Sequence, residues 1–108
     1  MFTMKEVNVT DLKKMMDNGD EFQLIDVREP HEYDICNLGG ELIPMGEITS
    51  QADRLSKDRQ VIIYCRSGAR SGQVCEYLEK KFGFSNVYNL KGGVLAWSDE
   101  IDPTMPKY

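Results

Sequence analysis

The chain has 108 residues, of which 41% are hydrophobic and 29% charged, and its formal net charge is −5. This length and composition predict one globular domain over residues 1–108, and the acidic balance excludes attraction to nucleic-acid phosphates as a main activity. No apolar stretch is long enough to cross a membrane and residues 1–8 lack a secretory signal, so we expect a cytoplasmic protein.

Periodicity and turn residues predict secondary structure along the whole chain. The N-terminal part is expected to contain an extended entry at 7–9, a helix from its N-cap Thr10 to Gly19, a strand over 22–27, and a short helix that begins at Pro30. A loop with a brief strand over 38–45 and a helix over 47–55 follow. The C-terminal part is expected to contain a strand over 60–64, a long helix over 71–82, a strand over 86–90 and a helix over 94–101.

This alternation of strands and helices is typical of βαβ units, in which a helix connects two parallel strands. The predicted fold is therefore α/β, with a mainly parallel central sheet and helices on both faces. Val61–Tyr64 has no polar break, which indicates a strand that is covered on both sides.

The three cysteines, Cys36, Cys65 and Cys75, form no Cys-x-x-Cys pair and are odd in number. A disulfide framework and a zinc site are both disfavoured by this pattern, so we expect no metal and reduced thiols. Cys75 has the position of a core residue on the helix over 71–82.

Cys65 stands where the predicted strand over 60–64 ends and a short loop leads into a helix. Ligands of α/β folds bind at this carboxyl end of the sheet. The backbone N–H groups of the helix N-terminus, together with Arg66 and Arg70, would favour the thiolate form of Cys65. Ser67 and Gly68 would let the loop amides turn inward around the sulfur as an anion nest.

The alternative is that Cys65 is a small buried apolar residue and Gly68 an ordinary turn residue. The order of strand, cysteine, glycine, arginine and helix favours a nucleophile instead. On that hypothesis Cys65 lies at the mouth of the loop, and a sulfur sealed in the interior with no cavity around its tip would rule out the enzyme. Arg28, at the end of another strand, could serve an internal carboxylate or an incoming anion, and the internal role is favoured.

Three segments, in this order, resemble signatures of the single-domain rhodanese family of sulfurtransferases. They are Leu24–Tyr33 (LIDVREPHEY), Cys65–Ser71 (CRSGARS) and Lys91–Trp97 (KGGVLAW). The resemblance covers nearly the whole chain. One departure is the segment Cys36–Glu41, which stands where the family commonly has Gly-His-Ile-x-Gly-Ala.

The resemblance implies a rhodanese-like fold and a cysteine that cycles between thiolate and persulfide without a cofactor. Carried onto this chain, Cys65 is the sulfur-bearing nucleophile, and Asp26 and Arg28 are mainly architectural. The anion-binding loop would consist of Arg66, Ser67, Gly68, Ala69 and Arg70.

The implied reaction moves a sulfane sulfur from thiosulfate or a persulfide donor to a thiol, cyanide or a sulfur-carrier protein. The charges of Arg66 and Arg70 favour a small anionic donor such as thiosulfate. The segments 33–38 and 96–102, together with the ending 105–108, are also similar to rhodanese domains fused to enzymes that adenylate sulfur carriers. Membranes and nucleic acids are not expected as partners.

Two other functions stay open at this point. The first is phosphoester or arsenate chemistry, because cysteine phosphatases also close a cysteine loop with arginine. Their loops resemble Cys-x₅-Arg, whereas four residues separate Cys65 from Arg70 here, which favours sulfur. The second is a non-catalytic binding module, against which the intact cysteine and arginines argue.

Overall fold

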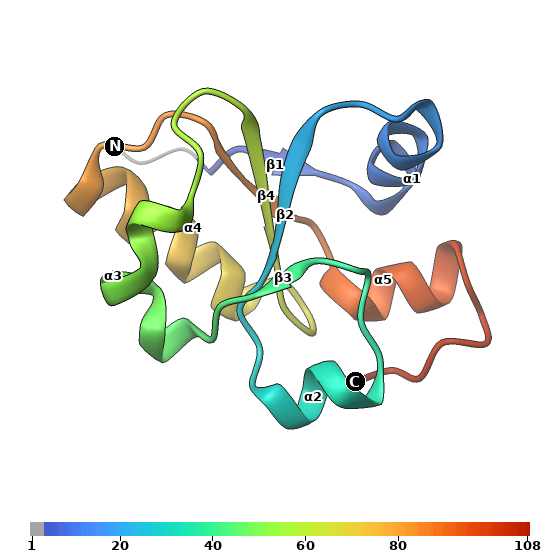
Figure 1. Cartoon of the computed structure of the whole chain (residues 1–108). Helices are drawn as coiled ribbons and strands as arrows, with labels where there is room; N and C mark the ends of the chain where they lie inside the picture. The colour runs from blue at the N-terminus through green and yellow to red at the C-terminus, as the bar shows by residue number, and fades with distance from the viewer. Residues whose placement is uncertain (1–3) are drawn as a thin grey trace.

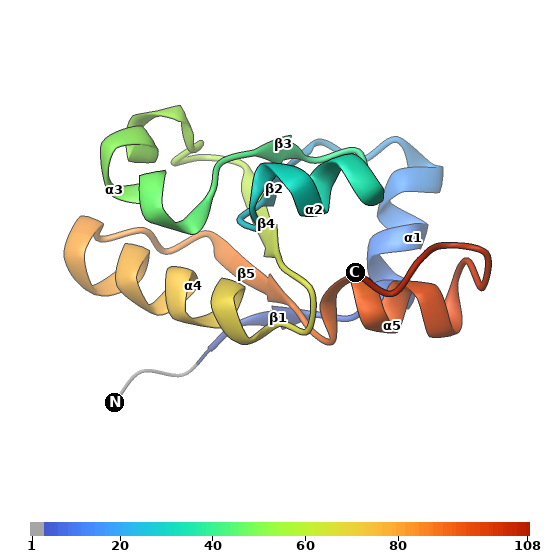
Figure 2. The same cartoon turned by 90° about the horizontal axis from the view of Figure 1, so that it is seen from below.

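The computed structural model describes residues 4–108, which fold around one five-stranded sheet in the order β1-β5-β4-β2-β3 (Figure 1, Figure 2). Every neighbouring pair of strands is parallel, which confirms the predicted α/β class. The strands are β1 (Glu6–Val7), β2 (Phe22–Asp26), β3 (Glu41–Leu42), β4 (Gln60–Tyr64) and β5 (Val87–Leu90). The helices are α1 (Val9–Asn18), α2 (Pro30–Ile35), α3 (Ile48–Gln51), α4 (Ala69–Phe82) and α5 (Gly93–Glu100), with 3₁₀ turns η1 (Met45–Glu47) and η2 (Ala52–Arg54).

The central strand β4 contributes to two hydrophobic cores because its side chains alternate between the two faces of the sheet. Val61 and Ile63 pack with α3 and α4, whereas Ile62 and Tyr64 pack with α1 and α5. All four side chains are fully buried. Figure 2 shows these helix pairs on opposite sides of the sheet, so helices cover both faces as predicted.

The first helix begins earlier than predicted. Its N-cap is Asn8, whose side-chain oxygen accepts a hydrogen bond from the backbone N–H of Asp11 at 2.8 Å, and Thr10 lies inside the helix. Asparagine is at least as good an N-cap as threonine, so both positions were compatible with the sequence. The predicted end at Gly19 is confirmed by its left-handed backbone, with φ of 70°.

The helix predicted over 47–55 is broken into η1, α3 and η2. The periodic residues Ile48, Ala52 and Leu55 are nevertheless buried, as the pattern requires. A nine-residue segment is too short to be a stable helix on its own, so packing of these three side chains decides its geometry.

The strand order brings two loops together at the carboxyl edge of the sheet. β2 and β4 are neighbours, with Asp26 paired to Tyr64 at their ends, so α2 and α4 both begin beside the same edge. Within residues 4–108, no helix has the length and apolarity needed to span a membrane.

Candidate active site

In the loop after β4, the first carbonyl groups point toward α5, whereas later N–H groups point toward the sulfur of Cys65. The carbonyl oxygen of Cys65 accepts from the N–H of Val94 at 3.1 Å, and that of Arg66 accepts from Leu95 at 3.0 Å. Gly68 has φ of 101°, a conformation that only glycine adopts without strain, and it reverses the chain into α4. The first turn of α5 therefore anchors the loop from one side.

Hydrogen-bond donors converge on the sulfur of Cys65 from the other side. The backbone N–H of Gly68 lies 3.1 Å from Sγ, and the backbone N–H and the hydroxyl of Ser71 each lie 3.4 Å from it. These donors are fixed by the start of α4, so they stabilise negative charge on sulfur without reorienting.

These contacts determine the pKa of the Cys65 thiol. Burial by itself raises this pKa, but hydrogen bonds from the Ser71 hydroxyl and from the backbone N–H groups of Ser71, Gly68 and Ser67 lower it by more. The net pKa lies below the ordinary value of a thiol, so a larger fraction of Cys65 is ionised at neutral pH.

The predicted exposure of Cys65 is wrong, because the residue is only 1% exposed. The loop wraps around the sulfur, and the exposed side chains of Arg66, Ser67 and Ala69 lie on the outside of the loop. Because the sulfur is buried, the site is not open to solvent in this conformation. A sulfur donor reaches Cys65 only if part of this covering moves.

The two loop arginines are placed differently from the expectation that both would act directly on the thiolate. Arg70 forms two hydrogen bonds to the carboxylate of Glu32 in α2, at 2.7 and 2.9 Å. Arg66 is exposed and donates to the carbonyl oxygen of Lys107 at 3.5 Å. The charge of Arg70 is thus largely offset by Glu32, and hydrogen bonds are the main stabilisation of the thiolate.

Asp26 and Arg28 form a completely buried ion pair beneath α2. Nη2 of Arg28 lies 2.8 Å from Oδ2 of Asp26 and 2.6 Å from the carbonyl oxygen of Cys36, while Nη1 has no hydrogen-bond partner. The hydrogen bonds and charge of Asp26 outweigh desolvation and raise the pKa of Arg28, so it stays charged. This geometry joins β2 to the end of α2, which is an architectural arrangement.

Sequence reasoning missed the partners Glu32 and Asn89 and assigned no role to Ser71. Asn89 of β5 is buried and lies behind the loop, where its Oδ1 accepts from the Ser71 hydroxyl at 2.5 Å. Its Nδ2 donates to the carbonyl oxygen of Gly68 at 3.1 Å. Only the strand order could have revealed these contacts, since it places β5 beside β4.

The remaining thiols and His31 lie outside this arrangement. Cys75 is a core residue of α4, as predicted, and burial raises its pKa to about 12. Cys36 is half-buried, and His31 is exposed on α2. Among residues 4–108, no three His, Cys, Asp or Glu side chains are grouped in a way that would hold a metal ion.

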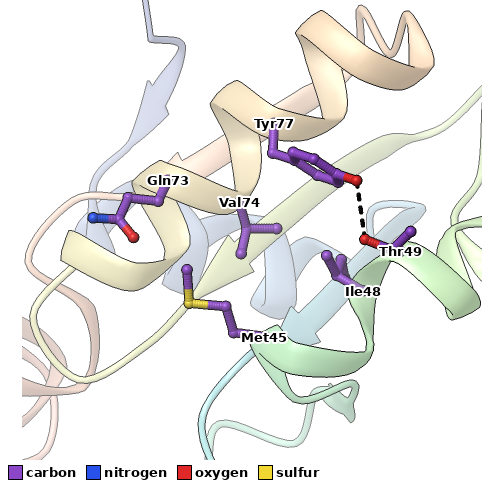
Figure 3. A pocket seen from close by; sticks show the side chains of 6 residues that line it. All are labelled: Met45, Ile48, Thr49, Gln73, Val74 and Tyr77. Carbon is purple, nitrogen blue, oxygen red and sulfur yellow. Dashed lines mark hydrogen bonds between the residues drawn. The ribbon is translucent and has the colours of Figure 1, made fainter.

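Two pockets lie along α4 near the loop. One, of about 320 Å³, separates α4 from α3 and η1, and its rim is closed by a 3.0 Å hydrogen bond between Thr49 and Tyr77 (Figure 3). The other, of about 360 Å³, includes Gly68 and Gly72. Cys65 lines neither pocket, so neither leads directly to the sulfur.

Comparison with known proteins identifies the family. A family model described as a rhodanese-like domain matches residues 8–100. The chain belongs to the rhodanese family. In agreement with this, the rhodanese-like domain protein from Staphylococcus aureus has a TM-score of 0.81 and 33% identity, covering 91% of this chain and 95% of that one.

Curated relatives add information about function. A protein of Allochromatium vinosum named "Sulfurtransferase" is 38% identical over 88% of this rhodanese domain and 89% of its own length. The "Probable adenylyltransferase/sulfurtransferase MoeZ" of Mycobacterium tuberculosis is 39% identical over 91% of this chain, which spans only 26% of MoeZ. These names support a sulfurtransferase activity in broad terms.

Proposed function

We propose that this rhodanese domain is a sulfurtransferase that carries sulfur as a persulfide on Cys65. The observation that supports this most strongly is the set of donors around its sulfur: two backbone N–H groups and one hydroxyl within 3.4 Å. Such a set stabilises a thiolate, and it also stabilises the charge of a persulfide that replaces it.

In the first half-reaction, the Cys65 thiolate attacks the outer sulfur of the donor. With thiosulfate, the S–S bond breaks and its electron pair leaves with sulfite, so that a deprotonated Cys65 persulfide remains. With a persulfide R–S–S–H, the same attack releases the thiolate R–S⁻ and leaves Cys65–S–S–H. The lowered pKa of Cys65 increases the fraction of thiolate, and the thiolate attacks without a general base.

In the second half-reaction, an acceptor nucleophile attacks the outer sulfur of the Cys65 persulfide and restores the thiolate. Cyanide, a thiol or an activated sulfur-carrier protein would each serve. The similarity to part of MoeZ makes a carrier protein a reasonable acceptor to test. Two half-reactions through one covalent intermediate give ping-pong kinetics.

The geometry favours sulfur chemistry over phosphoester or arsenate chemistry. Four residues separate Cys65 from Arg70, and the guanidinium of Arg70 is bound to Glu32 rather than turned freely toward an oxyanion. An inserted residue after Ala69 is a direct test of the loop-size argument. If the insertion keeps thiosulfate turnover and adds no phosphate or arsenate binding, loop size does not select the substrate.

Cys65→Ser tests the proposal, with Cys36→Ser as the matched control. Sulfite release from thiosulfate in the presence of cyanide should be abolished in Cys65→Ser and unchanged in Cys36→Ser. The thermal midpoint of both variants should stay close to that of the parent protein. Sulfur transfer that persists in Cys65→Ser would show that another residue carries the sulfur.

A further inference from the structure

The last arginine of the loop, Arg70, is occupied by a carboxylate that comes from another part of the chain. The two terminal nitrogens of Arg70 face the two oxygens of Glu32, at 2.7 and 2.9 Å. This fork-to-fork geometry is the strongest form of an arginine–carboxylate pair, and it is also the geometry in which arginine binds anionic ligands. Glu32 therefore stands in the place that an anionic substrate would take on Arg70.

Glu32 is fixed in this position by its own helix. Only 6% of the residue is exposed, and its Oε1 also accepts a hydrogen bond from the backbone N–H of Glu29 at 3.0 Å. The hydrogen bonds from Arg70 are the largest cause of a lowered pKa, about 2, so the carboxylate is charged at every pH at which the protein would work. Arg70 is thus paired with a carboxylate that stays charged.

The negative charge of Cys65 also affects the pKa of Arg70. This pKa is raised first by the hydrogen bonds to Glu32 and further by the negative charges of Glu32 and Cys65. The hydrogen bonds of the guanidinium nevertheless go to Glu32. Arg66, the other cation of the loop, is exposed and turned toward Lys107.

These contacts bear on the kind of donor that the site accepts. Thiosulfate is a dianion, and it would have to displace Glu32 from Arg70 or approach the thiolate without the help of the Arg70 charge, which Glu32 offsets. A persulfide whose organic part is uncharged carries at most one negative charge, and its leaving thiolate becomes charged only as the S–S bond breaks, so it depends less on a free Arg70.

We propose that Glu32 sets the donor preference of this site by occupying Arg70, so that the site takes a persulfide with an uncharged organic part in preference to thiosulfate, the reverse of the preference expected from the loop arginines. This inference rests on the proposed sulfur transfer and specifies its donor class. Glu32 is a specificity-determining residue and does not touch the reacting atoms.

The test compares kcat/KM for two donors, thiosulfate and the persulfide of 2-mercaptoethanol, in Glu32→Gln. Glutamine keeps the shape and one hydrogen-bond acceptor but removes the charge. The ratio of kcat/KM for thiosulfate to that for the persulfide should rise about tenfold, the size of effect expected from one nearby, partly screened charge. A ratio that stays constant or falls would overturn the proposal.

Two controls make the result specific. Asp34→Asn removes an equal charge from an exposed position on the same helix and should leave the ratio unchanged. In an Arg70→Ala background, Glu32→Gln should change the ratio much less than in the parent, and an equal change would contradict an effect through Arg70. Because the ratio compares two donors on the same sample, a partly unfolded variant does not distort it.

The outcome also separates this inference from the proposed function. If neither donor leaves a persulfide on Cys65 of the parent protein, the sulfur transfer itself is refuted. If both donors load Cys65 and Glu32→Gln does not alter their ratio, only the role of Glu32 is refuted.

Discussion

Removal of the Ser71 hydroxyl should make the Cys65 thiol less acidic. This hydroxyl lies 3.4 Å from the sulfur and 2.5 Å from Oδ1 of Asn89, so its single hydrogen serves one of two acceptors at a time. A hydrogen bond to a charged group contributes about 1.5–3 kcal/mol, and a long, shared bond to sulfur belongs at the lower end of that range. Since one pKa unit corresponds to about 1.4 kcal/mol, Ser71→Ala should raise the pKa of Cys65 by about one unit.

The pH dependence of Cys65 alkylation by iodoacetamide measures this change, with the labelled peptide identified by mass. Because only the thiolate reacts, the midpoint should move to higher pH and the rate below the midpoint should fall about tenfold. Ser67→Ala is the matched control, since Ser67 acts on the sulfur through its backbone N–H. An unchanged midpoint in Ser71→Ala would refute the assignment of this hydroxyl to the thiolate.

Three further predictions concern stability, each measured by chemical denaturation. Burial raises the pKa of Cys75 to about 12 in the folded protein. The stability that this shift contributes is complete below the ordinary thiol pKa of about 8.5 and is lost as pH rises toward 12. Cys75→Ala should therefore remove that part of the loss of stability at alkaline pH. Gly93→Ala should cost about 3 kcal/mol or more, because a Cβ there would overlap the carbonyl oxygen of Cys65 and the backbone φ is 55°; a loss under 1 kcal/mol would contradict this tight packing. Asp26→Asn should cost about 3–5 kcal/mol, since Arg28 would remain buried without a counter-charge, and near-parent stability would show that this pair is dispensable.

The sequence was most informative where one local pattern determines the outcome. The strand Gln60–Tyr64 was predicted at its observed bounds, because four consecutive large apolar residues indicate a strand that is buried on both faces. The long helix was predicted to end near Gly83, and it does, because glycine adopts the left-handed backbone that stops a helix. Cys65 follows from these two elements, since it lies between them.

Features that depend on distant contacts could not be read from the sequence. Glu32 and Arg70 are 38 residues apart, and the local pattern of α2 does not distinguish Glu32 from Glu29 or Asp34 as the partner. The exposure of Cys65 was also mispredicted, because it depends on how tightly the loop closes over the sulfur. The broken helix over 47–55 has the same origin, since packing and not periodicity determines its path.

The most direct test of sulfur transfer is the intact mass of the protein after incubation with excess thiosulfate, followed by treatment with cyanide. We expect the protein to gain the mass of one sulfur atom, located on the peptide that contains Cys65, and to lose it to cyanide as thiocyanate. A protein that gains no sulfur from thiosulfate or from the persulfide of 2-mercaptoethanol, or gains it on Cys36 or Cys75, would contradict a persulfide on Cys65.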